Sequence, residues 1–183
     1  RHGRLEYTHW TTIADTLSVI AVAALIALVT AGAVSADDGR GGGRERAVFV
    51  QTNELDGNRI VVFQRHGDGR LSEEGSYSTG GNGGNVAPGT ASDRLGSQGS
   101  LVYDQRHRLL FAVNAGSDSV SVFRVHGTRL QLTDVDPSGG DFPASIAVHD
   151  DLVYVLNAGG VGIVQGFEIR GNRIQRLEGS ARS

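Results

Sequence analysis

The sequence contains no cysteine, no methionine and no lysine, and all 17 of its basic residues are arginine. Without cysteine, the segment can form no disulfide, no thiolate nucleophile and no cysteine-bound zinc site. Without lysine, it can hold no P-loop, no Schiff-base lysine and no Ser–Lys dyad. These absences remove several common classes of enzyme chemistry from consideration.

The sequence also has only a small excess of one charge over the other and little helical periodicity. The formal net charge is −3 and the pI is about 6.1, so we expect no basic face and no nucleic acid partner. No window after residue 40 has the apolar period of an amphipathic helix. The spacings of a calcium loop, a nucleotide-binding glycine loop and a nucleophile elbow are absent. The sequence therefore predicts no metal and no cofactor.

What the chain does contain is a repeat. Three segments, starting near Val48, Leu110 and Val153, share the order of an apolar strand, an asparagine, a turn of small residues and a strand ending near a phenylalanine. Asn114 and Asn157 are 43 residues apart. Four short strands repeated every ~40–50 residues are typical of a β-propeller blade. We predict an all-β, partial β-propeller with about three four-stranded antiparallel blades, at residues 47–78, 100–136 and 143–178.

The first of these blades shows only three strands, with no inner strand in its sequence pattern. The other two blades show all four. Three blades do not close a ring, because propellers usually have about four to eight of them. We therefore expect residues 47–183 to be an incomplete propeller domain of a longer protein with about seven blades, whose complete ring is a monomer.

An uncharged apolar run, residues 16–36, precedes the repeat. It ends in Ala33-Val34-Ser35-Ala36. A cleavage site after Ala36 would have small residues before it, as in a signal peptide. The alternative is an uncleaved N-terminal membrane anchor, because ~18–20 apolar residues can span a bilayer. We interpret residues 1–36 as an apolar, helical leader and residues 37–46 as a Gly/Arg linker. Both alternatives place the propeller outside the cytoplasm, and only the second attaches it to a membrane.

The topology of a propeller gathers certain loops at the mouth of its central channel. These are the turns between second and third strands and the crossings from an outer strand to the next inner strand. We expect a common rim for the turns 54–57, 116–118 and 159–161 and the long connection 79–99. A connection as long as 79–99 is usually functional or disordered. Four histidines fall in turns at the opposite end, where solvated side chains are expected: His66, His107, His126 and His149.

Several segments resemble the seven-bladed propeller lactonase family, which includes 6-phosphogluconolactonase-type and carboxymuconate-cyclase-like proteins. The segments are Ala47–Glu54, Thr79–Gly81, Ser97–Ser100, Leu110–Gly116, Phe142–Ala144 and Val153–Gly159. The resemblance covers residues 47–180 and is closest in kind to a secreted bacterial branch. It implies the hydrolysis or formation of a sugar or muconate-type lactone. Enzymes of the family tend to carry a Pro-Arg-His-like motif at an inner strand, whereas the corresponding positions here read Gln98-Gly99-Ser100 and Pro143-Ala144-Ser145.

The candidate site residues follow from the rim and from this resemblance. Glu54 matches an acidic residue of the family and is the candidate catalytic base. Gln98 is a candidate amide donor to a ligand. Asn53, Asn114 and Asn157 are candidate ligand contacts, with the alternative that each asparagine bonds its own turn. Two functions stay open, an exported lactonase and a non-catalytic module that binds a glycan, peptide or small ligand at the channel mouth.

Overall fold

The computed structural model describes residues 34–36, 46–86 and 94–183. The predicted leader helix up to residue 33, the linker from 37 to 45 and residues 87–93 of the long connection lie outside the described residues. All described residues belong to one compact unit, Ala31–Ser183. Among them, no helix is long and apolar enough to cross a membrane.

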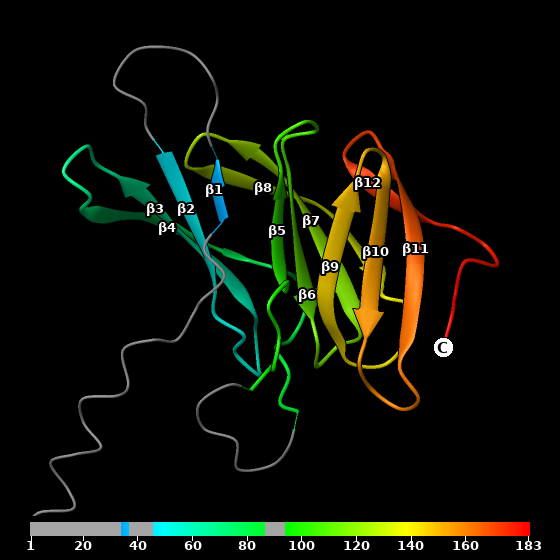
Figure 1. The fold of residues 1–183 in the computed structure, drawn as a ribbon. Helices are drawn as coiled ribbons and strands as arrows, with labels where there is room; N and C mark the ends of the chain where they lie inside the picture. Colours follow the sequence, from blue (N-terminus) through cyan, green and yellow to red (C-terminus); the bar gives the residue numbers. More distant parts are fainter. Residues whose placement is uncertain (1–33, 37–45, 87–93) are drawn as a thin grey trace, which may run out of the picture. The chain divides into compact units, whose positions relative to one another are not determined.

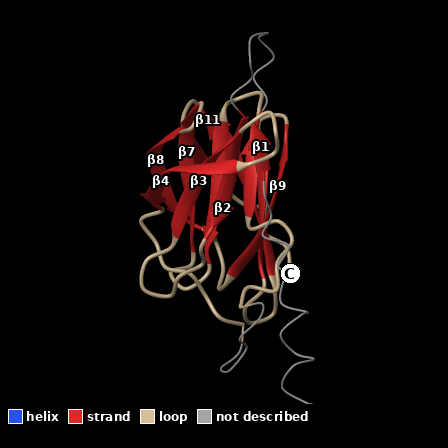
Figure 2. Ribbon diagram, turned by 90° about the vertical axis from the view of Figure 1, so that its left-hand side faces the viewer, coloured by secondary structure: helices blue, strands red, loops and turns tan. Residues whose placement is uncertain are grey.

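The described residues form three antiparallel sheets of four strands, in chain order (Figure 1), and Figure 2 shows strands and loops without a helix among them. The first sheet contains β1 (Val34–Ala36), β2 (Arg46–Gln51), β3 (Arg59–Arg65) and β4 (Leu71–Ser78). The second contains β5 (Leu101–Asp104), β6 (Leu109–Asn114), β7 (Ser119–His126) and β8 (Arg129–Pro137). The third contains β9 (Pro143–His149), β10 (Leu152–Asn157), β11 (Ile163–Arg170) and β12 (Arg173–Arg176). The all-β fold and the partial propeller are thus confirmed.

The first blade has a fourth strand that the sequence pattern did not predict. β1 pairs antiparallel with β2, so that Val34 lies opposite Phe49 and Ala36 lies opposite Ala47. The prediction of a missing inner strand was wrong because these residues also fit the end of an apolar leader, and edge pairing requires only backbone groups. A cut after Ala36 would separate β1 from its sheet.

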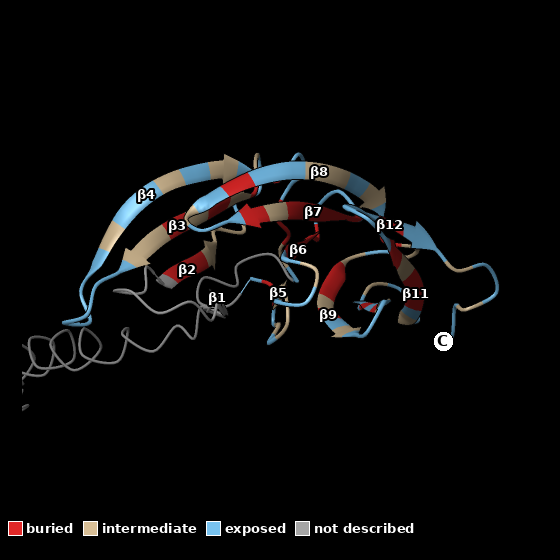
Figure 3. Ribbon diagram, turned by 90° about the horizontal axis from the view of Figure 1, so that it is seen from above, coloured by how far each residue is buried: buried red, intermediate tan, exposed pale blue. Residues whose placement is uncertain are grey.

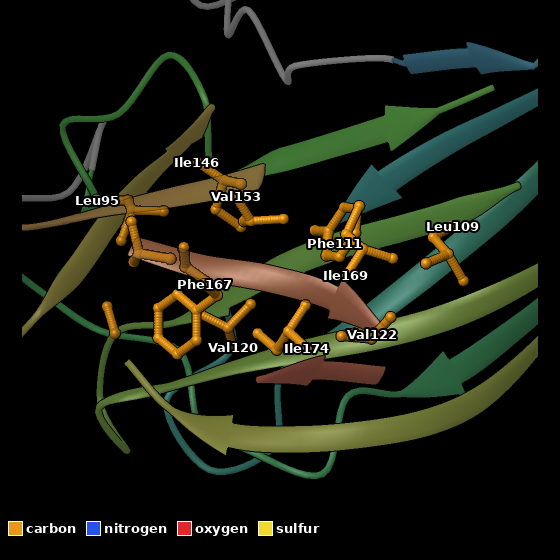
Figure 4. Close-up of a cluster of buried hydrophobic side chains, with 13 residues drawn as sticks. Leu95, Leu109, Phe111, Val120, Val122, Ile146, Val153, Phe167, Ile169 and Ile174 are labelled. Carbon is orange, nitrogen blue, oxygen red and sulfur yellow. The ribbon is translucent and has the colours of Figure 1, made fainter. Parts of the chain in front are cut away.

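The sheets pack through apolar faces. One core lies between the first and second sheets and includes Phe49, Leu110 and Phe123. A second core lies between the second and third sheets and includes Phe111 and Phe167 (Figure 4). Every residue of β6 is buried, because alternate side chains of a strand point to opposite faces and both faces are covered. This arrangement explains why the strand is apolar at nearly every position.

Among the described residues, cover of the third sheet lies on one face only. Val153 and Val155 of β10 are buried in the second core, whereas Tyr154 and Leu156 are 41% and 43% exposed. Most residues of the outer strands β4 and β8 are exposed or half-buried, and Figure 3 draws these two strands largely in pale blue and tan. The second sheet is therefore the one with apolar cover on both faces.

Asp136 in β8 should make the stability depend on pH. Its Oδ2 atom is buried and has no hydrogen-bond partner among the described residues. Burial, together with the neighbouring Asp134 carboxylate, raises its pKa from 3.8 to about 6. Between these values the folded state binds more protons than the unfolded state, so stability falls as the pH rises from about 4 to about 6.

The variant Asp136→Asn should remove this decrease of stability with rising pH. At pH 7 it should be more stable than the wild type by about 1 kcal/mol, because solvent screens much of the effect at this partly exposed carboxyl group. Urea denaturation at pH 4.5 and at pH 7 would measure the difference, with the exposed Glu73→Gln on β4 as control. An unchanged pH dependence in Asp136→Asn would contradict the assignment.

Candidate functional site

The turns between second and third strands and the crossings between blades lie together at one end of the sheets. We call them the rim loops: residues 52–58, 79–86, 94–100, 115–118, 138–142 and 158–162. Backbone hydrogen bonds join them, from Gly83 N to Glu54 O at 2.7 Å and from Gly116 N to Asn82 O at 3.1 Å. The expectation of a common rim is confirmed for the described residues.

The glycine-rich segment Thr79–Gly84, which we call the strap, is fixed between the first two blades. Gly84 and Asn53 exchange two hydrogen bonds, from Asn53 Nδ2 to Gly84 O and from Gly84 N to Asn53 Oδ1, both 2.9 Å long. The strap also contacts the second blade through a 3.0 Å bond from Asn82 N to Ser117 Oγ. The chain therefore crosses from the first blade to the second along a defined backbone path.

Close approach explains why this path is glycine-rich. A Cβ at Gly81 would lie 2.5 Å from Asn114 Cγ, and a Cβ at Gly84 would lie 2.5 Å from the Ala115 Cβ. A Cβ at Gly83 would overlap the backbone of Asn53. Only glycine allows backbone and neighbour to approach this closely.

Asn114 is the centre of a buried hydrogen-bond network beneath the strap, and its side chain is fully buried. Its Oδ1 accepts a 3.0 Å bond from Asn58 Nδ2, and its Nδ2 donates a 2.7 Å bond to Ser121 Oγ. Ser121 Oγ in turn donates a 2.7 Å bond to Thr79 O. The network therefore joins the first blade, the second blade and the strap.

The three candidate asparagines do not occupy one equivalent position. Asn114 and Asn157 are the last residues of β6 and β10 and are both fully buried. Asn157 Nδ2 donates a 3.2 Å bond to the carbonyl oxygen of Ser138, in the crossing from the second blade to the third. Asn53 lies two residues beyond the end of β2 and has a φ of 53°, a left-handed conformation that asparagine tolerates in turns. All three side chains hold rim loops in place.

Glu54 and Gln98 are the two candidates whose side chains face solvent. Both are exposed, and the Glu54 carboxylate makes no hydrogen bond or ion pair with the described residues. The backbone around each residue is fixed, because Glu54 O accepts the bond from the strap and Gly99 O accepts a 2.8 Å bond from Ile146 N. Each presents a free polar group from an ordered part of the rim.

The four histidines lie at the opposite end of the sheets, in or beside the turns there. His66, His126 and His149 are exposed. The expectation of a solvated side chain was wrong for His107, which is partly buried between two carboxylates. Its Nδ1 contacts Asp104, and its Nε2 lies 3.0 Å from Asp151 Oδ1 in the third blade. The sequence signal was Asp104 three residues before the histidine, together with acidic residues in the matching turn of the next blade.

The rim loops are acidic and carry no described metal centre. Within their described residues are four carboxylates and one guanidinium: Glu54, Asp56, Asp118, Asp141 and Arg94. Across residues 34–36, 46–86 and 94–183, no group of three His, Asp or Glu side chains could hold a metal ion. The described rim loops also expose three large apolar side chains, Leu55, Val86 and Val161, so they offer hydrogen-bonding, charged and apolar groups to a ligand.

Comparison with protein families shows where this fold belongs. The family model described as "Lactonase, 7-bladed beta-propeller" matches residues 43–170. The chain belongs to this lactonase family. Membership agrees with the three consecutive four-stranded sheets and with the resemblance seen in the sequence. No curated protein matches the chain.

Three of the solved structures that match this fold are bacterial. The periplasmic gluconolactonase of Pseudomonas aeruginosa is 22% identical with a TM-score of 0.58, over 82% of this chain and 40% of that one. A protein of unknown function from Desulfotomaculum acetoxidans is 17% identical with a TM-score of 0.54, over 80% and 41%. A protein from Bacteroides uniformis, provisionally named a 6-phosphogluconolactonase, is 14% identical with a TM-score of 0.50, over 76% and 40%. The chain thus spans about 40% of the length of these lactonase-fold structures.

Proposed function

We propose that the protein is an exported lactonase that opens a sugar or muconate-type lactone at the rim. The observation that carries the proposal is the ordered rim itself, where Glu54 presents a carboxylate that has no partner among the described residues, beside a strap fixed to two blades. Family membership supports the reaction class. The likeness to a periplasmic gluconolactonase supports the location, at the level of the fold.

In the proposed reaction, Glu54 acts as the general base. Its carboxylate takes a proton from a water molecule, whose oxygen adds to the lactone carbonyl carbon. The ring C–O bond then breaks, the ring oxygen takes the proton that Glu54 holds, and a hydroxy acid leaves. Gln98 is proposed to donate an amide hydrogen bond to the substrate. The buried asparagines act indirectly, by holding the strap and the neighbouring crossings.

A second candidate is a non-catalytic propeller that binds a small molecule or carbohydrate at the rim. The specific observation in its favour is that no histidine lies in the described rim loops. The positions corresponding to the family's Arg-His motif read Gly99-Ser100 and Ala144-Ser145. Such a protein would retain the ordered polar rim and would lack turnover.

We propose that the protein is exported, with either a cleaved signal peptide or an uncleaved leader that anchors it. A cleaved signal would release the protein and, with a cut after Ala36, would leave a first blade without β1. An uncleaved leader would keep β1 paired with β2 and attach the propeller to a membrane. The pairing of β1 supports retention of residues 34–36.

The reaction is tested with Glu54→Gln in the full-length protein that contains this chain. The variant should lower kcat for glucono-1,5-lactone by about tenfold or more with little change in KM, because a positioned base contributes ~10²–10⁴-fold to a rate. The charge-neutralising control is Glu73→Gln on the exposed face of β4, which should stay within about twofold of the wild type. Steady-state kinetics with a pH-indicator assay of acid release would provide both values.

The outcomes separate the two candidates. A wild-type protein that opens none of a panel of sugar and muconate lactones, but binds an unreactive lactam analogue, would establish the binding module. Full activity in Glu54→Gln would remove this residue from the reaction.

A further inference from the structure

The strap offers one position at which a side chain can project. Thr79 is buried, and a Cβ at Gly81, Gly83 or Gly84 would overlap neighbouring atoms. Asn82, between these glycines, is exposed, and its amide makes no hydrogen bond with the described residues. The strap therefore presents a single free polar side chain on a fixed backbone.

The same arrangement recurs at the next blade junction. Ser138-Gly139-Gly140-Asp141 follows β8 as Thr79-Gly80-Gly81-Asn82 follows β4. The backbone contact recurs as well, because Gly159 N donates to Asp141 O at 2.9 Å and Gly116 N donates to Asn82 O at 3.1 Å.

Both side chains lie beside equivalent turns. The Asn82 Cβ would be 3.5 Å from a Cβ at Gly116, and the Asp141 Cβ would be 2.8 Å from a Cβ at Gly159. Asp141 is exposed, and its carboxylate makes no hydrogen bond or ion pair with the described residues. Two successive junctions thus display one free polar group each, in the same backbone setting.

We propose that Asn82 and Asp141 are ligand-binding residues of the rim, and that the ligand is an uncharged polyhydroxylated lactone ring. This inference rests on the proposed function. The Asn82 amide can both donate to and accept from ring hydroxyls, whereas the Asp141 carboxylate accepts from them. Because the backbone is already fixed at both positions, binding costs little additional ordering of the protein.

The charge of the rim argues for an uncharged ligand. The described rim loops hold four carboxylates and one guanidinium, so a phosphate or carboxylate on the substrate would meet like charge. Phosphate recognition generally uses arginine forks or backbone N–H groups, and Arg94 is the one arginine in these described loops. A sugar lactone with free hydroxyls matches the described rim loops better than its phosphate ester.

The test compares Asn82→Ala and Asp141→Ala with the wild type in the full-length protein. Each variant should raise KM for glucono-1,5-lactone by about tenfold, with kcat within about twofold, because a lost binding contact acts equally on ground and transition states. Each should also raise the Kd for glucono-1,5-lactam, an unreactive analogue, by about tenfold in calorimetry. Matched controls are Gln105→Ala and Glu73→Gln, both exposed and away from the rim loops, which should leave both constants within about twofold.

Substrate class is tested by the ratio of kcat/KM for glucono-1,5-lactone to that for its 6-phosphate. The wild-type ratio should exceed about ten, and Asp141→Asn should narrow it by about fivefold because one repelling charge is removed. A wild type that prefers the phosphate ester would overturn the assignment of the ligand.

Failure of this inference is distinguishable from failure of the proposed reaction. Turnover with unchanged KM and Kd in both alanine variants overturns the binding roles and leaves the lactonase standing. Lactam binding that both alanine variants weaken, without turnover by the wild type, supports the binding roles and removes the reaction. A wild type that neither turns over the lactone nor binds the lactam overturns both.

Discussion

Replacing Asn114 with leucine should lower the free energy of unfolding of the full-length protein by about 3 kcal/mol. Leucine has the same number of side-chain heavy atoms and the same branching at Cγ, so the change removes hydrogen bonds without opening a large cavity. It leaves Asn58 Nδ2 without its bond to the Asn114 carbonyl oxygen, and it leaves Ser121 Oγ without a donor. Both groups are fully buried. Each keeps one other hydrogen bond, from Asn58 Nδ2 to Val113 O and from Ser121 Oγ to Thr79 O. The variant therefore leaves one buried N–H donor and one buried oxygen acceptor site unsatisfied, and each such loss costs ~1–3 kcal/mol.

Denaturant titration would measure this loss. The control Gln105→Leu, at an exposed turn, should change stability by no more than about 0.5 kcal/mol. A loss below 1 kcal/mol in Asn114→Leu would show that water replaces the missing partners. The buried network would then not be what holds the strap between the blades.

Residues 34–183, produced on their own, should self-associate through the uncovered face of the third sheet. Tyr154, Leu156 and Val164 are 41%, 43% and 38% exposed there, and all three belong to neighbouring strands of one sheet. A contiguous apolar surface of this kind is typical of an interaction site or an aggregation site. Sedimentation velocity should show species larger than the monomer, in proportions that rise with protein concentration.

The double variant Tyr154→Lys with Leu156→Lys should restore a monomer, because two positive charges oppose association of that face. The matched control is Leu71→Lys, which replaces a 50% exposed leucine on the outer strand β4 and should leave self-association unchanged. If the control and the double variant behave alike, the third sheet is not the contact surface.

The strands were predictable because their pattern is local and repeated. β6 and β10 follow from the apolar runs ending in Asn114 and Asn157, and the glycine- and aspartate-rich turns set the strand ends. β1 was not predictable in this way. Three residues carry no strand pattern of their own, and Val34–Ala36 also fit the end of an apolar leader.

The site was predictable in place but not in detail. Topology alone puts the turns and crossings at one end, and it put Glu54 and Gln98 there. The roles of single residues depend on contacts between distant parts of the chain. Asn58, which bonds to Asn114 56 positions away, does not stand out in the sequence. Asn82 becomes notable only once the clashes at the surrounding glycines are known.

At two successive blade junctions, a glycine N–H in the turn between second and third strands donates a hydrogen bond to a carbonyl oxygen of the crossing. That carbonyl belongs to Asn82 at the first junction and to Asp141 at the second. Because the fold uses only the backbone at this place, the side chain can vary during evolution at little cost to stability. A ring that arose by duplication can therefore carry a different side chain at each junction. New ligand preferences can then arise by single substitutions, without insertion of a new loop.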